Sequence, residues 1–159
     1  MCIRDSNVRA LTELSLAFIG SLERHRGGIL NVGSIAGFLP GPGMAVYYAT
    51  KAYVLSFSEA LHSELKPRVV RVTVLCPGPV PTEFAVRAGI SAGLAPGMLT
   101  QSAASVAEAG FRGLMAGQRV VVPGLANKLV AFLIRIVPRR LLLRMVDSRQ
   151  SRRRSAQNT

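Results

Sequence analysis

Apolar positions follow two patterns along the chain, which predict helices and short strands in turn. Spacings of three and four residues predict helices over residues 7–25, 46–65, 102–116 and 125–149. Short apolar runs between the helices predict strands at residues 29–33, 69–75 and 119–122. The first of these runs is uninterrupted, which favours a strand buried on both faces.

The order of these elements predicts the fold class. Helices and strands that alternate at this spacing indicate parallel strands joined by right-handed crossovers, an α/β sheet with helices on both faces. A doubly wound nucleotide-binding domain has about six strands, so three strands match its second half. Residues 1–6 show no periodicity, and we expect an artefact or a truncated start there.

Composition and charge narrow the function classes. With 49% apolar and 18% charged residues, the 159-residue chain can bury a core, which excludes a wholly disordered protein. The net charge is +12, but ten of the 20 basic residues and one of the eight acids lie in residues 119–159. Cys2 and Cys76 match no metal spacing, so we expect no metal site and a reducing, cytoplasmic compartment.

A possible acid–base pair lies on the second predicted helix. Tyr47 and Lys51 are four residues apart, on one face and one turn from each other. An ammonium group near a phenol favours the phenolate, which suits a proton donor or acceptor near neutral pH. Taken alone, the pair also fits a helix with one buried tyrosine and one solvated lysine.

Further candidate residues follow the predicted strands. Ser34 comes just after the run 29–33, and Pro77-Gly78 comes after the run 69–75. Ligands of open α/β sheets bind outside the carboxyl ends of strands, and glycine lets backbone approach a flat ligand. Each also has an ordinary structural explanation as a loop serine or a turn, and Asn7 fits a helix N-cap.

Together these residues resemble the short-chain dehydrogenase/reductase family. The resemblance covers residues 7–124 and is carried by Asn7, Asn31-Val32-Gly33-Ser34-Ile35-Ala36-Gly37, Tyr47-Tyr48-Ala49-Thr50-Lys51 and Cys76-Pro77-Gly78-Pro79-Val80-Pro81-Thr82. It implies the catalytic half of a Rossmann-like domain. It also implies Ser34, Tyr47 and Lys51 as catalytic residues, with Asn7 as the fourth.

The resemblance further implies a reaction and its partners. It implies that a carbonyl and an alcohol are interconverted with NADP or NAD, NADP being favoured. The implied cofactor-binding residues are Tyr47, Lys51, Pro77, Gly78, Val80 and Thr82. Residues 82–101 would form a substrate lid, and the helices 7–25 and 46–65 would form a homodimer or tetramer interface.

The cofactor half of such a domain is missing from this sequence. The chain has no G-x-G-x-x-G turn after a strand and no Asn-Asn-Ala-Gly turn. Compared with the family, roughly 100 residues of a six-stranded domain are absent. We therefore expect this chain alone to be inactive.

The C-terminal part is apolar and basic. Residues 129–146 contain four arginines, and their longest apolar run, Leu129–Ile134, is well short of the ~20 residues of a membrane span. Two alternatives stay open: a helix packed on the sheet or on a partner, and a helix lying on an anionic membrane surface. We expect the tail 150–159 to be disordered and solvated, without nucleic-acid binding.

Residues 119–146 also resemble reductases of hydrophobic ketones, which act on 3-oxoacyl or steroid-like substrates. The main prediction is thus an oxidoreductase of such a carbonyl compound. The alternative is a non-catalytic module that dimerises or contacts a membrane surface.

Overall fold

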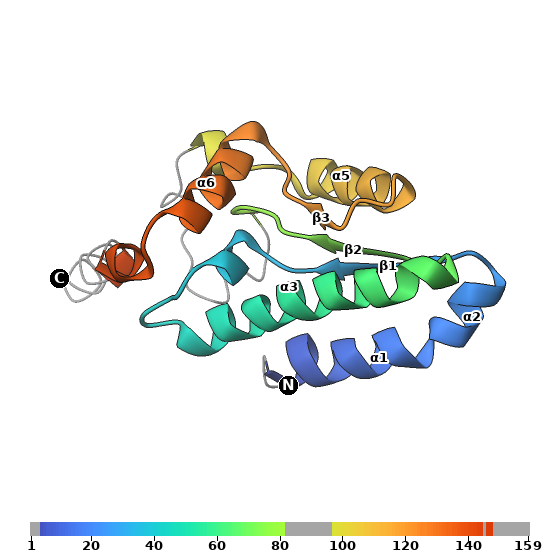
Figure 1. Ribbon diagram of the computed structural model, residues 1–159. Coiled ribbons are helices and arrows are strands. Elements are labelled where there is room, and N and C mark those ends of the chain that lie inside the picture. Colours follow the sequence, from blue (N-terminus) through green and yellow to red (C-terminus); the bar gives the residue numbers. More distant parts are fainter. Residues whose placement is uncertain (1–3, 82–96, 145, 148–159) are drawn as a thin grey trace.

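The computed structural model describes residues 4–81, 97–144 and 146–147. A parallel sheet of three strands lies between layers of helices (Figure 1). The strands are β1 (Gly28–Val32), β2 (Arg71–Leu75) and β3 (Val120–Val121), in the order β1-β2-β3. Both pairings are parallel, so the predicted α/β class is confirmed.

Two crossovers place helices on opposite faces of the sheet. Helix α3 (Ala45–Leu65) and the short η3 (Lys66–Arg68) connect β1 to β2 and cover one face. The short η5 (Gly97–Leu99) and α5 (Ala103–Met115) precede β3, and α5 covers the other face (Figure 1). Ser102 is the N-cap of α5, and its side chain accepts a hydrogen bond from the Ser105 amide at 3.2 Å.

The core is built around β2, because this central strand is covered on both faces. Val74 and Cys76 are fully buried and pack against Val54 and Leu55 of α3. Leu75 points to the other side and packs against Val106 of α5. The clearest strand in the sequence is therefore the centre of the fold.

The prediction that the first strand is buried on both faces is wrong. Only Asn31 of β1 is buried, and Val32 is 54% exposed. The reason is that β1 pairs with β2 alone among the described residues and forms an edge of their sheet. Asn31 donates a hydrogen bond to Ser58 of α3 at 3.0 Å, which satisfies its buried amide.

The first and last predicted helices are interrupted. The first consists of η1 (Asp5–Ala10), α1 (Leu11–Ala17) and α2 (Ile19–Arg24), and Phe18 separates the last two. The last begins as α6 (Leu125–Ile136), and helical structure resumes at residue 139. Val137 is extended because it precedes Pro138, and this interrupts the helix predicted over residues 125–149.

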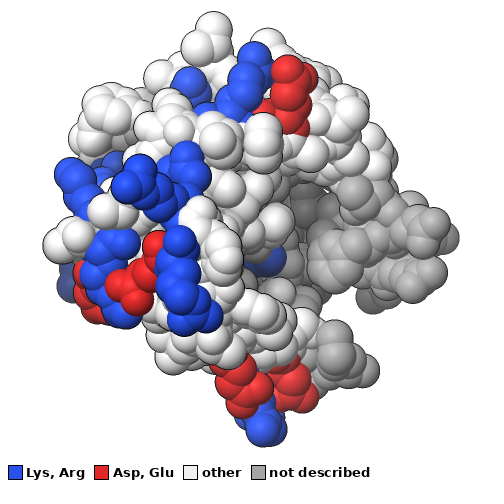
Figure 2. Space-filling model, turned by 90° about the vertical axis from the view of Figure 1, so that its right-hand side faces the viewer, with Lys and Arg blue, Asp and Glu red and all other residues white. Residues whose placement is uncertain are grey.

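Basic side chains gather at one end of the molecule. Figure 2 looks at the end where α2 and the C-terminus of α3 lie and shows Lys and Arg with acidic side chains among them. Arg68 forms a two-pronged contact with Glu23, and Arg71 donates to the Arg26 carbonyl at 2.8 Å. These cations lie at the amino ends of the strands, away from the predicted site.

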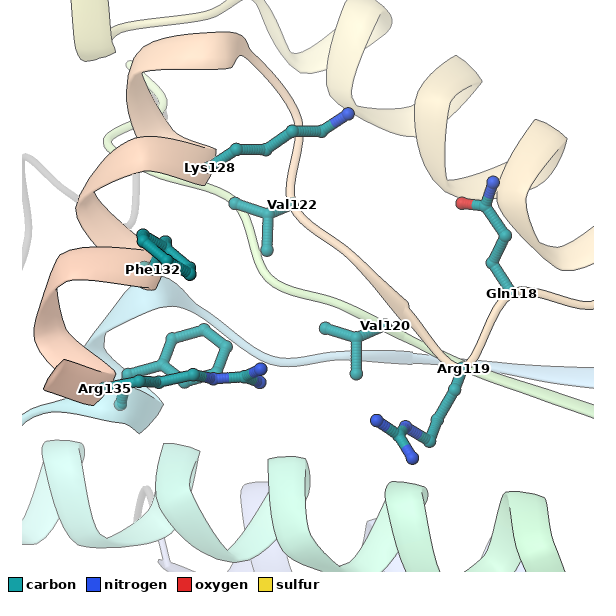
Figure 3. Close-up of a pocket in the computed structure, with 9 residues that line it drawn as sticks. Gln118, Arg119, Val120, Val122, Lys128, Phe132 and Arg135 are labelled. Carbon is teal, nitrogen blue, oxygen red and sulfur yellow. The ribbon is translucent and has the colours of Figure 1, made fainter.

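A groove of about 490 Å³ follows the free edge of β3 (Figure 3). Its walls come from η2 (Ile35–Phe38), β3 and α6. Lys128 and Arg135 extend into it from α6, and the Arg135 guanidinium lies 5.3 Å from the centre of the Phe38 ring. Arg119 points toward α3, where it pairs with Glu59 at 3.1 Å. The groove is therefore cationic with apolar walls.

Candidate active site

The carboxyl ends of β1 and β2 meet, as the sequence predicts. Their hydrogen bonding continues beyond the strands: the Gly33 amide donates to the Leu75 carbonyl at 2.8 Å, and the Ile35 amide donates to the Pro77 carbonyl at 3.0 Å. The loop that carries Ser34 is therefore held beside Pro77. This is the edge at which open α/β sheets bind ligands.

Ser34 has an extended backbone and caps η2. Its Oγ accepts a hydrogen bond from the Ala36 amide at 3.1 Å. Since this contact uses the oxygen as an acceptor, the hydroxyl proton is left to donate, and it meets no acceptor among the described residues. A substrate oxygen placed here would find a hydrogen-bond donor.

Lys51 reaches from α3 to the end of β1. Its Nζ donates to the Val32 carbonyl at 2.9 Å, two residues before Ser34. Burial lowers the pKa of the Lys51 ammonium below its usual range. Gly37 allows this approach of η2 to α3, because a Cβ at that position would lie 2.7 Å from the Lys51 carbonyl oxygen.

Cys76 lies between these groups, at the end of β2. Burial raises the pKa of its thiol to about 12, opposed by the backbone amide of Ser34 and the charge of Lys51. The thiol is therefore neutral and packs as an apolar group. Its interactions with both neighbours indicate that Ser34, Lys51 and Cys76 share one small region.

Asn7 connects to the tyrosine through a residue that the sequence analysis missed. Asn7 Nδ2 donates to Thr50 Oγ1 at 3.2 Å, and Thr50 Oγ1 donates to the Tyr47 carbonyl at 2.8 Å. Thr50 lies on α3 and is buried where this helix contacts η1. Its position within the turn between Tyr47 and Lys51 was the signal in the sequence from which it could have been identified. The expectation that Asn7 fits a helix N-cap is wrong, because η1 begins at Asp5 and Arg4 holds the N-cap position. Asn7 instead links η1 to α3.

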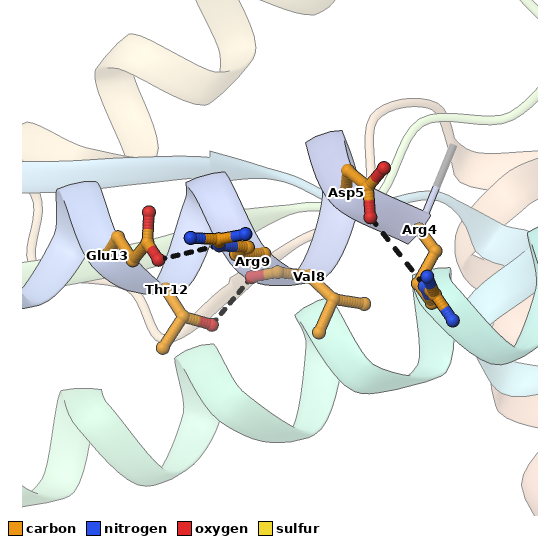
Figure 4. A network of polar contacts seen from close by, with 6 residues as sticks. All are labelled: Arg4, Asp5, Val8, Arg9, Thr12 and Glu13. Atoms are coloured by element: carbon orange, nitrogen blue, oxygen red, sulfur yellow. Dashed lines mark hydrogen bonds and ion pairs between the residues drawn. The ribbon is translucent and has the colours of Figure 1, made fainter. Parts of the chain in front are cut away.

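The segment that carries Asn7 is held by contacts along its own helix (Figure 4). Arg9 pairs with Glu13 at 2.9 Å, and Arg4 lies 3.6 Å from Asp5. Thr12 Oγ1 donates to the Val8 carbonyl at 2.7 Å. Thr12 also shares a 2.7 Å hydrogen bond with Tyr53 of α3, so η1 and α1 are fixed against α3.

Tyr47 and Tyr48 have different surroundings. Their rings meet edge to face, with centres 5.8 Å apart. The Tyr48 ring lies directly against Gly41, where a Cβ would fall 2.1 Å from the ring. Tyr48 therefore packs against the loop before α3.

A second residue missed in the sequence is Asn127, at the start of α6. It is fully buried, and its Nδ2 donates to the carbonyls of Leu99 at 3.1 Å and Pro123 at 3.0 Å. Gly78 lies against this amide, since a Cβ there would be 2.4 Å from Asn127 Oδ1. Asn127 Oδ1 has no hydrogen-bond partner among the described residues. Only its polarity within an apolar helix marked it in the sequence.

The remaining predicted residues are less fully defined. Val80 is partly buried and packs against the cluster around Leu75, on the α5 side. Thr82 and most of the predicted lid 82–101 lie outside the described residues. Within the described ranges, no three His, Cys, Asp or Glu side chains gather as a metal site would require.

The described residues fit one end of a dinucleotide. Lys51 offers a partly buried ammonium for hydroxyl groups, and Ser34 offers a hydroxyl proton at the neighbouring strand end. A Gly-rich turn for the pyrophosphate is missing from the sequence. The fit therefore concerns the nicotinamide end only.

Comparison with known proteins agrees with this geometry. A family model described as short chain dehydrogenase matches residues 3–92. An inactive 2-(S)-hydroxypropyl-CoM dehydrogenase 2 from Xanthobacter autotrophicus is 45% identical over 64 residues, which are 40% of this chain and 28% of the relative. The NADP-dependent 3-hydroxy acid dehydrogenase YdfG of Salmonella typhi is 46% identical over 82 residues, which are 50% of this chain and 33% of the relative.

Among solved structures, a short-chain dehydrogenase from Sphingobium yanoikuyae in complex with NADPH is similar, with a TM-score of 0.68 and 34% identity. The match covers 79% of this chain and 50% of that one. The chain thus spans about a third of the curated relatives' length and half of the solved structure's.

Proposed function

Because this chain belongs to the short-chain dehydrogenase family, we propose that it carries the catalytic half of an NADP-dependent oxidoreductase. The proposed reaction interconverts a carbonyl and an alcohol. One observation carries the proposal: the Lys51 ammonium is bonded to the Val32 carbonyl, beside the loop of Ser34 and one helical turn from Tyr47. In this proposal a charged donor, a hydroxyl proton and a phenol act together at one strand end.

The proposed roles follow from the chemistry of each group. Tyr47 gives a proton to the developing alkoxide, or removes it in the oxidative direction. Ser34 donates a hydrogen bond to the same oxygen and stabilises its negative charge. The positive charge of Lys51 would stabilise negative charge that develops beside it, and Asn7 holds the helix turn in place through Thr50. Bound nicotinamide would supply or accept the hydride.

NADP is proposed over NAD. The support is a similar structure that contains NADPH and a relative named as NADP-dependent. Lys51 and Tyr47 would hold the nicotinamide ribose, and Pro77, Gly78, Val80 and Thr82 would line the ring and its amide. In the full-length protein, quenching of NADPH fluorescence at lower concentration than NADH would support this preference, and the reverse order would contradict it.

The proposed substrate is a hydrophobic carbonyl compound such as a 3-oxoacyl or steroid-like ketone. One relative is named for 3-hydroxy acids, and a 3-oxo acid differs from a 3-hydroxy acid by one hydride and one proton. The apolar residues of the C-terminal segment favour the hydrophobic members of this class.

A homodimer or tetramer is proposed through α1 and α3. The two helices lie side by side in Figure 1, and they expose large apolar side chains to solvent. Leu14 of α1 is 59% and Val46 of α3 58% exposed, and Phe18, which directly follows α1, is 57% exposed. A second copy that covers them would remove this apolar surface from water.

The domain assignment is also a proposal. Residues 7–124 form the catalytic half, residues 125–149 an apolar and basic C-terminal unit, and 150–159 a basic tail. Since the adenosine and pyrophosphate sites belong to the other half, the 159-residue chain should not turn over NADPH with a ketone. Steady-state NADPH oxidation by this purified chain would contradict that expectation.

The decisive experiment compares two neighbouring tyrosines in the full-length protein. Tyr47→Phe removes the proposed proton donor, and we expect kcat to fall about 10²–10⁴-fold. Tyr48→Phe is the matched control, since it keeps the ring that packs on Gly41 and should retain activity. Equal activity of the two variants would contradict the assignment of Tyr47.

The alternative function is a non-catalytic dimerising module. The exposed apolar side chains of α1 and α3 are the observation that favours it, together with the name of one relative as inactive. Tyr47→Phe separates the two functions: a change in assembly with no activity to lose would favour the module.

A further inference from the structure

Helix α6 exposes a row of apolar side chains on the face opposite its buried positions. Asn127, Ala131 and Ile134 are its buried positions. The opposite face carries large apolar side chains that are 48–84% exposed: Leu125, Leu129, Phe132, Leu133 and Ile136. Because these positions are three or four residues apart, they form one continuous stripe. We call these five residues the α6 stripe.

The surroundings of the α6 stripe are cationic. No Asp or Glu occurs between Glu108 and Asp147, whereas Arg or Lys occurs at seven positions of that interval: 112, 119, 128, 135, 139, 140 and 144. Lys128 and Arg135 have no carboxylate within 4 Å in the described part of the chain. The charge that surrounds the stripe is therefore not neutralised locally.

The cations lie along one border of the stripe. Figure 3 shows that Lys128, Phe132 and Arg135 leave α6 on the same side, with the ring between the two cations along the helix. Beyond Pro138 the same composition continues, since Leu141 and Leu143 are 49% and 40% exposed and Arg139, Arg140 and Arg144 are exposed as well. The segment beyond Pro138 thus carries the same two kinds of exposed side chain as α6.

The charge of a second copy of this chain does not complement this surface. A two-fold interface brings the same patch of both subunits together, so cations would face cations. Like charges brought together in this way oppose association. An anionic partner matches both the charge and the apolar stripe.

We propose that the α6 stripe docks on an anionic lipid bilayer, with its apolar side chains at the acyl boundary and the flanking cations on lipid phosphates or carboxylates. The helix would lie in the plane of the interface. It has 12 residues and a length of about 18 Å, against a hydrocarbon core of about 30 Å. Consistent with this, none of the described helices is long and apolar enough to cross a membrane.

The test uses sedimentation with two vesicle types, pure phosphatidylcholine and a phosphatidylcholine–phosphatidylserine mixture. The 159-residue chain should sediment with the phosphatidylserine vesicles, and added salt should release it. Phe132→Ser should weaken binding at least tenfold, because a large side chain leaves the apolar stripe. Lys128→Gln should weaken it about fivefold, the effect of one cation near a charged surface.

Matched controls distinguish docking through the α6 stripe from nonspecific adsorption to vesicles. Phe111 on α5 and Phe132 are both 60% exposed, so Phe111→Ser removes the same side chain from another helix and should leave binding unchanged. Lys66→Gln is the control for Lys128→Gln, since Lys66 lies at the other end of the molecule. The urea midpoint of each variant verifies that the fold is retained.

Three results would overturn the proposal. The first is equal binding to both vesicle types. The second is equal loss of binding in Phe132→Ser and Phe111→Ser. The third is a chain that ignores vesicles but elutes as a dimer that Phe132→Ser converts to a monomer, because a second copy would then cover the stripe. None of these results depends on catalytic activity, so the proposed function is tested separately.

Discussion

Replacement of Gly78 by alanine tests how the strand-end turn is held. The new Cβ would lie 2.4 Å from Asn127 Oδ1 and 2.6 Å from Nδ2, whereas ordinary contacts begin near 3.4 Å. The Asn127 amide would have to move by about 1 Å. It is fully buried and holds the carbonyls of Leu99 and Pro123, so it has no free space to move into.

The expected cost follows from these contacts. Overpacking of a buried site costs about 1–3 kcal/mol, and each strained hydrogen bond contributes about 0.5–1.5 kcal/mol. We therefore expect Gly78→Ala to lower the free energy of unfolding by about 2–4 kcal/mol. With a slope of about 2 kcal/mol per molar urea, the midpoint should fall by about 1–2 M.

The assay is urea unfolding of four proteins: the original chain, Gly78→Ala, Asn127→Ala and the double variant. Asn127→Ala leaves two buried carbonyls unpaired and should itself be destabilising. It also opens the space that the new Cβ needs, so the double variant should be more stable than the sum of the single effects by at least ~1 kcal/mol. An unchanged midpoint for Gly78→Ala, or strictly additive effects, would refute the reasoning.

Three further predictions concern single groups. Burial raises the pKa of the Cys76 thiol from 9.0 to about 12. Its contribution to the free energy of unfolding is therefore complete below pH 9 and is lost above pH 9, by about 1.4 kcal/mol per pH unit. Between pH 8 and pH 10 the urea midpoint of the original chain should fall more than the urea midpoint of Cys76→Ala. Gly113→Ala should destabilise α5, because the new Cβ would lie 2.2 Å from a methyl group of buried Val121. Gly20→Ala is its counterpart on α2, where the atom nearest to the new Cβ is 3.7 Å away. In the same urea assay, Gly20→Ala should stabilise α2 by up to ~1 kcal/mol. Burial lowers the pKa of Lys51 in the folded chain, so the unfolded chain binds more protons just below pH 10.5. The stability of the original chain relative to Lys51→Met should therefore rise as the pH approaches 10.5. A difference that stays constant with pH would contradict a lowered pKa of Lys51.

The parts of the fold that the sequence predicted well have their signals in local residues. Helix α3 begins one residue before the predicted start and ends at the predicted residue, where Lys66-Pro67 stops it. The β-branched run of β2 is an equally local signal. Such signals act through backbone preferences that do not depend on distant partners.

The parts that were missed depend on tertiary contacts. An apolar run is compatible with burial on one face or two, and only the sheet order shows that β1 lies at an edge. Asn127 satisfies the carbonyls of Leu99 and Pro123, and Leu99 is 28 residues away in sequence. Hydrogen bonds of this kind leave no periodic pattern from which a site residue could be inferred.

The candidate site is predictable to a greater degree because it is nearly contained in one βαβ unit. Ser34 follows β1, Tyr47 and Lys51 lie on α3, and Pro77 follows β2, so a single right-handed crossover determines their relative positions. The spacing in sequence then translates into proximity at one sheet edge, and the bond from Lys51 to Val32 is the result. The adenosine end of a dinucleotide would instead contact strands on the open side of β1, which this chain does not supply among its described residues. In the proposed function, the groups for the nicotinamide end and the groups for the adenosine end therefore belong to separable parts of such a fold, and a chain can retain the first without the binding energy of the second.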